Sequence, residues 1–392
     1  MDTLAQTNVR PVTVTSESVS EGHPDKVCDF IADSIVDAYL TQDAGSRVAC
    51  EVLCKRNLVV VAGEITSRAR IDYERVVRQA IAEIGYTDDS EPFSADTAQI
   101  LLALTKQSGE IGRAVDGPQH GSPDQGAGDQ GIMFGYATDE TPELMPLPVV
   151  LAHAVTKGLA DDRKTGRVGW LRPDSKAQVS VVYQDGQPQH VSHVLVSTQH
   201  ARGASADDVN AYVREELAPR ALGRWFDPGT RFIVNPSGSF VEGGPSADCG
   251  VTGRKIIADS YGGVGRHGGG AFSGKDPSKV DRSAAYFCRY VARAIVASGI
   301  ARRAELLVSY AIGQPTPLSV KVDTFGTGDD GAAAQFVEGF DFRPGQIARE
   351  LDLLRPIYRS TTNYGHFGRS GLPWESSRGA GPVGSTVREG GR

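Results

Sequence analysis

The hydrophobic positions of the chain become periodic near residue 24, whereas residues 1–11 carry no pattern and are expected to be frayed. Pro24 follows His23 at a position suited to the first turn of a helix, and apolar residues then recur at helical spacing towards Gly45. The pattern predicts a first helix at 24–45, a hairpin of strands at 47–54 and 58–66, and a second helix at 73–84 that Gly85 closes.

The same order of helix, hairpin and helix recurs twice along the chain. The second set is predicted at 147–160, at 176–183 with 190–198, and at 207–217. The third set is predicted at 277–298, at 305–312 with 318–325, and at 344–354. The hairpins start at 47, 176 and 305, which is an equal spacing and indicates structurally similar units.

These patterns predict an α+β fold with three similar α/β domains, each a β-sheet covered by helices. Residues 106–130 are polar, rich in Gly and Pro and too long for an ordinary connection, so we predict a mobile lid there. The expected organisation is a flexible N-terminus at 1–12, an N-terminal domain at 13–112, a mobile active-site loop and linker at 113–130, a central domain at 131–242, a C-terminal domain at 243–375 and a disordered tail at 376–392.

Composition narrows the class of protein. The chain has 392 residues, 40% of them hydrophobic, a net charge of −7 and no apolar run long enough to cross a membrane, so we expect neither a nucleic-acid nor a membrane partner. Five cysteines without a C-x-x-C pair argue against a disulfide framework or a zinc site and fit a reducing cytoplasm.

Candidate chemistry concentrates in residues 254–281, which are dense in glycine and cationic side chains. Residues 269–275 match the G-x-x-x-x-G-K phosphate loop, whose backbone N–H groups turn towards phosphate oxygens. Asp276 stands where that motif needs Ser or Thr, and with Pro277 it predicts the N-cap and first residue of a helix.

Charged side chains flank this predicted phosphate cradle. Lys275 and Lys279 are spaced to face one polyanion, and further cations are Arg254, Lys255, Arg266 and His267. Asp248 and Asp281 bracket the cluster, which predicts magnesium between carboxylates and a phosphate chain. A plain glycine-rich surface turn is the alternative.

Four other features carry weaker signals. GAGDQG at 126–131 has the spacing of a dinucleotide motif but no preceding strand, so a tight turn presenting Asp129 to a ligand is the better interpretation, with a plain turn as the alternative. His23, Asp25 and Lys26 surround a helix start, where a second phosphate contact and metal carboxylate are expected, unless His23 is simply a cap. The remaining acids and lysine lie on predicted strands, where the alternative is a solvated face or turn: Glu51, Glu64, Asp174 and Lys176.

These motifs together resemble the S-adenosylmethionine synthetase family, also called methionine adenosyltransferases, over about residues 13–375. The most specific stretches are GAGDQGIMFGYATDET and GGGAFSGKDPSKVDRSAAY, supported by TSESVSEGHPDK, WLRPDSK, GGPSADCGVTGRK and YGHFGR. The resemblance implies attack of the methionine sulfur on ribose C5′ of ATP, release of triphosphate and its hydrolysis to diphosphate and phosphate. It also implies pseudo-threefold symmetry of the domains and a homodimer or homotetramer with active sites between subunits.

The resemblance further implies roles for single residues. His23 would lie near the leaving oxygen, Asp25 and Asp281 would hold two Mg²⁺ per site, and Glu51 would bind K⁺. The expected phosphate contacts are Lys176, Arg254, Lys255, Lys275 and Lys279. Contacts with adenosine or methionine are expected from Asp129, Asp174, Asp248, Ala271, Glu64, Gln107, Ile312 and again Lys279.

Two rival functions stay open at the level of the sequence. A phosphate-loop kinase or NTPase would transfer the terminal phosphoryl group, and Asp276 in place of Ser or Thr argues against it. A nucleotide-binding regulatory protein without chemistry would have little use for so many lysines and acids around the phosphates. The phosphorus products formed from ATP, methionine, magnesium and potassium would separate the three functions.

Overall fold

The computed structural model describes residues 10–88, 91–106 and 125–376. Most of the predicted lid and the predicted tail lie outside these ranges. The N-terminal half contains β1 (Val12–Val19), α1 (Pro24–Gln42), β2 (Arg47–Lys55), β3 (Leu58–Thr66), α2 (Tyr73–Ile84), β4 (Gln99–Thr105), β5 (Gly131–Thr138), α4 (Leu147–Lys164), β6 (Leu171–Gln184) and β7 (Gln187–His200). The C-terminal half contains α5 (Ala206–Ala211), η1 (Tyr212–Leu217), α6 (Ala218–Leu222), η2 (Gly223–Trp225), β8 (Arg231–Val234), α7 (Gly244–Ala247), β9 (Gly250–Val251), α8 (Ile256–Asp259), α9 (Val280–Ala297), β10 (Arg303–Tyr310), β11 (Ser319–Asp323), α10 (Asp330–Val337), α11 (Pro344–Glu350), η3 (Arg359–Thr361) and η4 (Pro373–Glu375).

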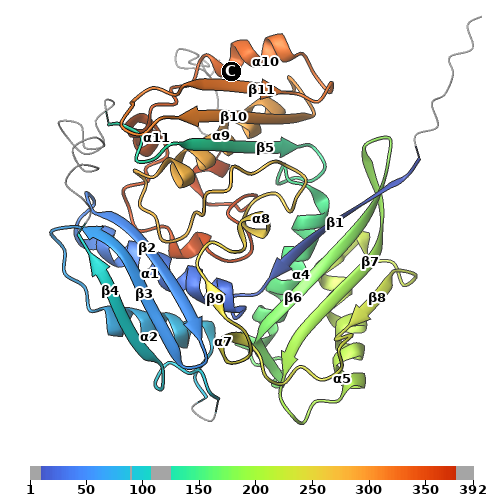
Figure 1. Cartoon of the computed structure of the whole chain (residues 1–392). Helices are drawn as coiled ribbons and strands as arrows, with labels where there is room; N and C mark the ends of the chain where they lie inside the picture. Colours follow the sequence, from blue (N-terminus) through green and yellow to red (C-terminus); the bar gives the residue numbers. More distant parts are fainter. Residues whose placement is uncertain (1–9, 89–90, 107–124, 377–392) are drawn as a thin grey trace, which may run out of the picture.

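The described strands form three sheets, each built around one hairpin (Figure 1). The strand orders are β4-β3-β2-β9, β1-β6-β7-β8 and β11-β10-β5. A long helix precedes each hairpin and packs against its sheet: α1 on β2, α4 on β6 and α9 on β10. This repetition confirms the predicted α+β fold of three similar units.

Each sheet borrows a strand from a distant part of the chain. The N-terminal sheet receives β9, the central sheet receives β1, and β5 joins the C-terminal sheet beside β10. Along β1 the pairing runs from Val12 opposite Tyr183 to Val19 opposite Lys176. The units are therefore interlocked by backbone hydrogen bonds, and α8 lies centrally between the sheets (Figure 1).

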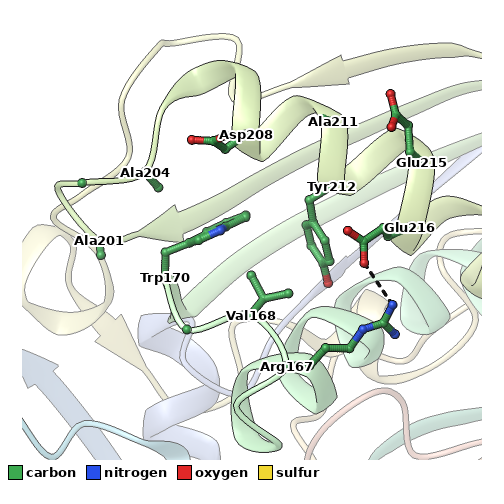
Figure 2. Close-up of a pocket in the computed structure, with 12 residues that line it drawn as sticks. Arg167, Val168, Trp170, Ala201, Ala204, Asp208, Ala211, Tyr212, Glu215 and Glu216 are labelled. Carbon is green, nitrogen blue, oxygen red and sulfur yellow. Dashed lines mark hydrogen bonds and ion pairs between the residues drawn. The ribbon is translucent and has the colours of Figure 1, made fainter.

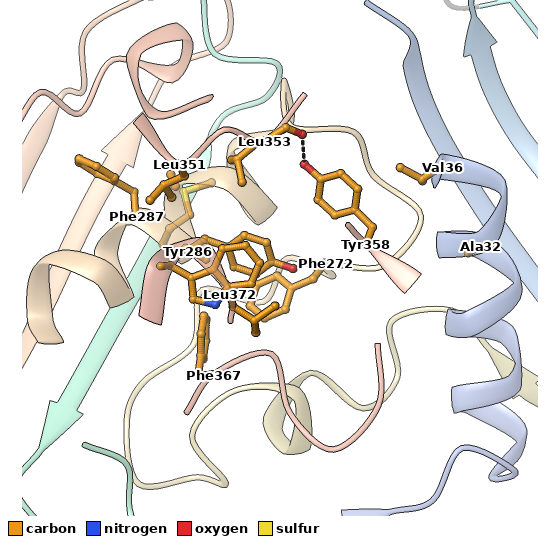
Figure 3. Close-up of a cluster of buried hydrophobic side chains, with 14 of the residues drawn as sticks. Ala32, Val36, Phe272, Tyr286, Phe287, Leu351, Leu353, Tyr358, Phe367 and Leu372 are labelled. Carbon is orange, nitrogen blue, oxygen red and sulfur yellow. Dashed lines mark hydrogen bonds between the residues drawn. The ribbon is translucent and has the colours of Figure 1, made fainter. Parts of the chain in front are cut away.

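The main core forms where α1 and α9 meet the C-terminal segment (Figure 3). Tyr286 of α9 stacks on Trp374 with ring centroids 3.7 Å apart, and both side chains are buried. The buried Arg282 bridges to α1 through Asp33, at 2.6 Å between Nη1 and Oδ1. Because both partners are desolvated, losing either one would leave an unpaired buried charge. The core thus fixes α1 relative to α9.

The structure corrects several predicted elements. α2 occupies the predicted range, but β1 was missed in a segment expected to precede the first element, and β4 was also missed. The second hairpin is longer than predicted, and β6 and β10 begin at Leu171 and Arg303, so the equal spacing is not kept. The second helix of the central unit changes to a π-helix at η1. α9 begins at Val280, not at Pro277, because Asp276 makes tertiary contacts instead of capping a helix.

Candidate active site

The first turn of α1 places His23 and Asp25 together. Pro24 fits the first helical position, and His23 is the N-cap, with Nδ1 accepting a hydrogen bond of 3.2 Å from the backbone N–H of Asp25. Both side chains are buried. Asp25 accepts from Lys255 Nζ at 2.7 Å and from the backbone N–H of Val251 at 3.0 Å. The predicted helix start is confirmed, and it meets the segment that contains Arg254 and Lys255.

Protonation at this helix start is set by burial and by cations. Burial, together with the nearby ammonium groups of Lys255 and Lys176, lowers the pKa of His23 to about 3, so the imidazole is neutral at pH 7. For Asp25, burial alone would raise the pKa, but the hydrogen bonds from Lys255 and Val251 hold it below its usual value. A neutral imidazole beside an ionised carboxylate can hydrogen-bond to a ligand without carrying charge itself.

Strand β6 contributes Asp174 and Lys176 to the same region. Asp174 is buried, and its Oδ2 accepts a hydrogen bond of 2.8 Å from the backbone N–H of Gly244. Its Oδ1 has no hydrogen-bond partner among the described residues. Burial raises the pKa of Asp174 to about 6, while the Gly244 hydrogen bond and Lys176 oppose the rise. A buried carboxylate oxygen without a partner is suited to a ligand hydroxyl.

The segment after α7 completes a first group of site residues. Arg254 is largely exposed and lies 3.8 Å from Asp25, whereas Lys255 is mostly buried. Asp248 is exposed and close enough to raise the pKa of Asp174. We call the following set the first group: His23, Asp25, Asp174, Lys176, Asp248, Arg254 and Lys255.

A second cluster of candidate site residues lies at the start of α9. It contains Lys275, Lys279 and Asp281. Lys275 Nζ lies 2.6 Å from Asp281 Oδ2, and Lys279 Nζ lies 2.5 Å from Asp276 Oδ2. Asp276 is fully buried and accepts from the backbone N–H of Val48 at 2.7 Å. The N-cap of α9 is Lys279, so the prediction that Asp276 and Pro277 begin the helix is wrong.

Backbone N–H groups at the end of the glycine-rich loop are bonded within the protein and do not form an open cradle. The N–H of Gly274 donates to Asp33 at 2.9 Å, and the N–H of Asp276 donates to the carbonyl of Val48 at 3.1 Å. Gly274 has φ +84°, and a Cβ there would lie 2.0 Å from the Cys50 carbonyl oxygen. These two N–H groups hold the end of the loop against α1 and β2, so they are not available to a phosphate chain. Arg266 pairs with Glu305 of β10 at 2.6 Å and, among the described residues, forms no bond to the lysines at the start of α9.

The GAGDQG turn lies beside this cluster at the start of α9. The backbone N–H of Gly128 donates to the Ser278 carbonyl at 3.2 Å, and Ala127 forms a bridge with Ile312. Asp129 and Ile312 are both exposed. β5 follows the turn. Ala271 lies on the glycine-rich loop that precedes α9. A Cβ placed on Gly253 would lie 2.5 Å from the Cβ of Ala271.

Glu51 and Glu64 stand on the outer face of the N-terminal sheet, next to Lys275. Ala49 pairs with Glu64 in the β2–β3 register and forms a bridge with Lys275. Partial burial raises the pKa of Glu51, and the Lys275 ammonium opposes the shift. The second group is therefore Glu51, Glu64, Asp129, Ala271, Lys275, Lys279, Asp281 and Ile312. Gln107 lies outside the described residues.

The two groups adjoin but do not merge within one chain. Gly253 meets Ala271 at their border, yet no hydrogen bond or ion pair between described residues joins one group to the other. Asp25 and Asp281, the predicted magnesium ligands, belong to different groups. Across residues 10–88, 91–106 and 125–376 no set of three or more His, Cys, Asp or Glu side chains could hold a metal ion alone.

Comparison with known proteins gives the same assignment along nearly the whole chain. Profiles of the S-adenosylmethionine synthetase N-terminal, central and C-terminal domains match residues 11–109, 124–240 and 242–376. The chain is 54% identical over 374 residues to S-adenosylmethionine synthase of Akkermansia muciniphila, covering 93% of this chain and 95% of the relative. For that of Sorangium cellulosum the values are 52% over 376 residues, 94% and 88%.

The chain belongs to the S-adenosylmethionine synthetase family. As a member of this family it is a methionine adenosyltransferase, which synthesises S-adenosylmethionine from ATP and L-methionine. The methionine sulfur attacks ribose C5′, and the triphosphate released is hydrolysed to diphosphate and phosphate. None of the described helices is long and apolar enough to span a bilayer.

A separate pocket of about 810 Å³ lies in the central unit of this synthetase (Figure 2). Trp170 and Tyr212 form its aromatic wall, with ring centroids 5.5 Å apart, and Arg167 pairs with Glu216 at 3.0 Å. No residue of either group lines it. The pocket is thus distinct from the candidate active site.

Sequence reasoning missed one residue that supports the first group and assigned another the wrong environment. Gln199 accepts a hydrogen bond of 3.3 Å from the backbone N–H of Asp174 through Oε1, and no motif marks it. Lys26 was expected as a phosphate contact, but its side chain is only 2% exposed and binds Asp29 and Asp259. The motif located Lys26 correctly and could not show that it points inward.

Proposed function

We propose that the first group of one subunit and the second group of its partner together form the site where ATP and methionine react. The observation that carries this proposal is the division of the candidate phosphate-binding cations in one chain. Lys176, Arg254 and Lys255 lie in the first group, whereas Lys275 and Lys279 lie in the second, with no bond between the groups among the described residues. Both groups reach the surface, so a second copy can complete each of them.

The outer face of the N-terminal sheet is the proposed contact between copies. Leu53, Val60 and Leu101 are opposite one another in the strand registers and share this face, and Leu101 is 55% exposed. Glu51 and Glu64 lie on the same face. A twofold contact of like faces would cover the apolar strip and bring the first group of the partner over these carboxylates. We propose a homodimer, with pairing of dimers into a homotetramer.

The chemistry follows from the charges of the combined site. Sulfur carries no proton, so attack on C5′ needs no base, and the barrier lies in the charge that develops on the departing triphosphate. Fixed cations stabilise that charge: Lys176, Arg254 and Lys255 from one subunit, and Lys275 and Lys279 from the other. Neutral His23 donates a hydrogen bond to the leaving oxygen. Asp174 accepts from a ribose hydroxyl through Oδ1.

Two Mg²⁺ per site fit the carboxylates that the site offers. Mg²⁺ keeps several waters and is usually bound by one or two carboxylates plus substrate phosphates, so a full protein cage is not needed. Asp25 and Asp281 would each supply one carboxylate. A Cβ at Gly270 would lie 2.2 Å from Asp281 Oδ1, so this glycine keeps the carboxylate accessible. The ions would supply charge neutralisation of the phosphates.

The other roles are proposed on the same geometry. Glu51 would bind K⁺ beside Lys275. Methionine would lie near Ala271, Ile312 and Glu64, with Asp129, Asp248, Lys279 and Gln107 completing the contacts to methionine or adenosine. We retain the predicted ranges of the three domains. A cytoplasmic location fits the five cysteines, which are all free thiols.

Mixed dimers test the shared site directly. Lys255→Ala and Lys275→Ala chains would each be inactive alone, but co-expressed chains would form dimers in which one of two sites is intact. Random pairing then restores about a quarter of wild-type activity. If the mixture stays inactive although mixed dimers are isolated, each chain builds its own site and the shared site is refuted.

A further inference from the structure

Lys26 forms a buried ion cluster that the chemistry above does not use. Its Nζ lies 2.6 Å from Asp259 Oδ1 and 3.0 Å from Asp29 Oδ2. The three side chains are 2%, 5% and 0% exposed. Burial alone would lower the pKa of Lys26, but Asp259 and Asp29 reverse the effect and raise it, so the ammonium stays charged. Because it faces inward, Lys26 cannot touch a phosphate chain.

The cluster joins the two segments that carry the first group. Lys26 follows Asp25 in α1, and Asp259 ends α8, directly after Arg254 and Lys255. Neighbouring contacts fasten the same surfaces: the N–H of Gly253 donates to Asp29 Oδ1 at 2.8 Å, beside the hydrogen bonds from Val251 and Lys255 to Asp25.

The backbones of the two segments are in direct contact at this ion cluster. A Cβ at Gly250 would lie 2.1 Å from the carbonyl oxygen of Pro24, so the backbones are already in contact. The Asp259 carbonyl also accepts from the N–H of His366 at 2.8 Å, which ties the far side of α8 to the C-terminal segment. A shift at Lys26 would therefore displace both the start of α1 and the segment that carries Arg254 and Lys255.

We propose that Lys26 is a positioning residue, whose ion pair with Asp259 sets the distance between His23 and Asp25 on α1 and Arg254 and Lys255 on the facing segment. The inference rests on the proposed function, because that function assigns those four residues to the triphosphate and its magnesium. A displacement of about 1 Å in a site that works by positioning lowers the rate roughly 100-fold. Binding of methionine should change less, because most of its proposed contacts lie in the second group.

The test is a double-mutant cycle on kcat with Lys26→Met, Asp259→Asn and the double variant. Thermal unfolding measures the folded fraction, and kcat per folded enzyme is measured with KM for ATP and for methionine. We expect each single variant to lose roughly 100-fold in kcat with KM for methionine changed less than about threefold. The double variant should be no worse than the poorer single variant by more than about threefold, because the two residues act as one pair.

A matched control separates positioning from stability. Glu375→Gln weakens another buried ion pair, with Arg289 at 2.9 Å, that does not contact either group. It should lower the unfolding temperature and keep kcat per folded enzyme within about threefold. An equal loss of kcat in this control, or wild-type kcat in folded Lys26→Met, would overturn the inference.

Misfolding of Lys26→Met and inactivity of the wild-type protein would each have a separate meaning. If Lys26→Met does not fold, Asp259→Asn alone decides, and normal kcat in that variant overturns the inference. If the wild-type protein makes no S-adenosylmethionine from ATP and methionine, the proposed site fails first, independently of Lys26.

Discussion

Replacing Lys275 by Ala should abolish most activity while leaving the fold intact. The side chain is 19% exposed and its Nζ pairs with Asp281 at 2.6 Å, so the change removes one cation from a site at the protein surface. The bridge between Ala49 and Lys275 uses backbone atoms, which alanine retains. Losing a partly exposed pair costs about 1 kcal/mol of stability or less. Losing one preorganised contact to a leaving group costs about 3–4 kcal/mol in the transition state, or roughly 100- to 1,000-fold in rate.

The assay is the rate of S-adenosylmethionine formation at saturating ATP and methionine, with thermal unfolding on the same samples. Lys157→Ala is the matched control, because Lys157 pairs with Asp161 at 2.5 Å on the exposed side of α4, outside both groups. The control should change neither rate nor unfolding temperature appreciably. A soluble, folded Lys275→Ala enzyme with near-normal turnover would refute the assignment of Lys275 to the triphosphate.

Three further predictions concern protonation, assembly and the corrected loop. The raised pKa of Asp174 means that the stability it contributes is fully present below its ordinary pKa of 3.8 and is lost as pH rises to about 6. Asp174→Asn should therefore gain free energy of unfolding relative to wild type between about pH 4 and pH 6, by up to about 3 kcal/mol in urea titrations, and a pH-independent difference contradicts this. Leu101→Lys should give monomers in sedimentation, and these should have little activity in rate measurements. Leu318→Lys, which changes an exposed leucine of the C-terminal unit, should give neither monomers nor a loss of activity. An active monomer argues against the shared site. Asp276→Ala should destabilise the protein by about 3–5 kcal/mol, because it removes the buried carboxylate that pairs with Lys279 and lies 3.7 Å from Arg47, and wild-type stability in urea would contradict a structural role of this carboxylate.

Local patterns predicted much of the fold. α2 was predicted over its observed range because an apolar stripe runs along it and Gly85, with φ 112°, ends it in a left-handed conformation. The hairpins were predictable from alternation and turns. β1 and β9 were not, because each is stabilised by strands more than a hundred residues away, which no local period records.

The candidate site was predictable in residue type but not in grouping. Motifs identified Asp25, Lys255 and Lys275, yet the sequence could not show that the first two contact each other and the third lies apart. Nor could it show that Asp276 and Lys26 point into the protein, because burial depends on the packing of distant segments. Local chemistry names the groups, and tertiary contacts decide which of them face a ligand.

The borrowed strands have a consequence for how the protein is made. On a ribosome, β2 emerges long before β9, its neighbour in the finished sheet, and β5 must wait for β10. Domains that fold in turn during synthesis are protected early, but here each nascent unit carries an unpaired strand edge until later residues appear. We therefore expect chains truncated before β9 to aggregate, and folding to be completed for all three units together after translation. We therefore also expect the growing chain to need chaperones until its late strands have been made.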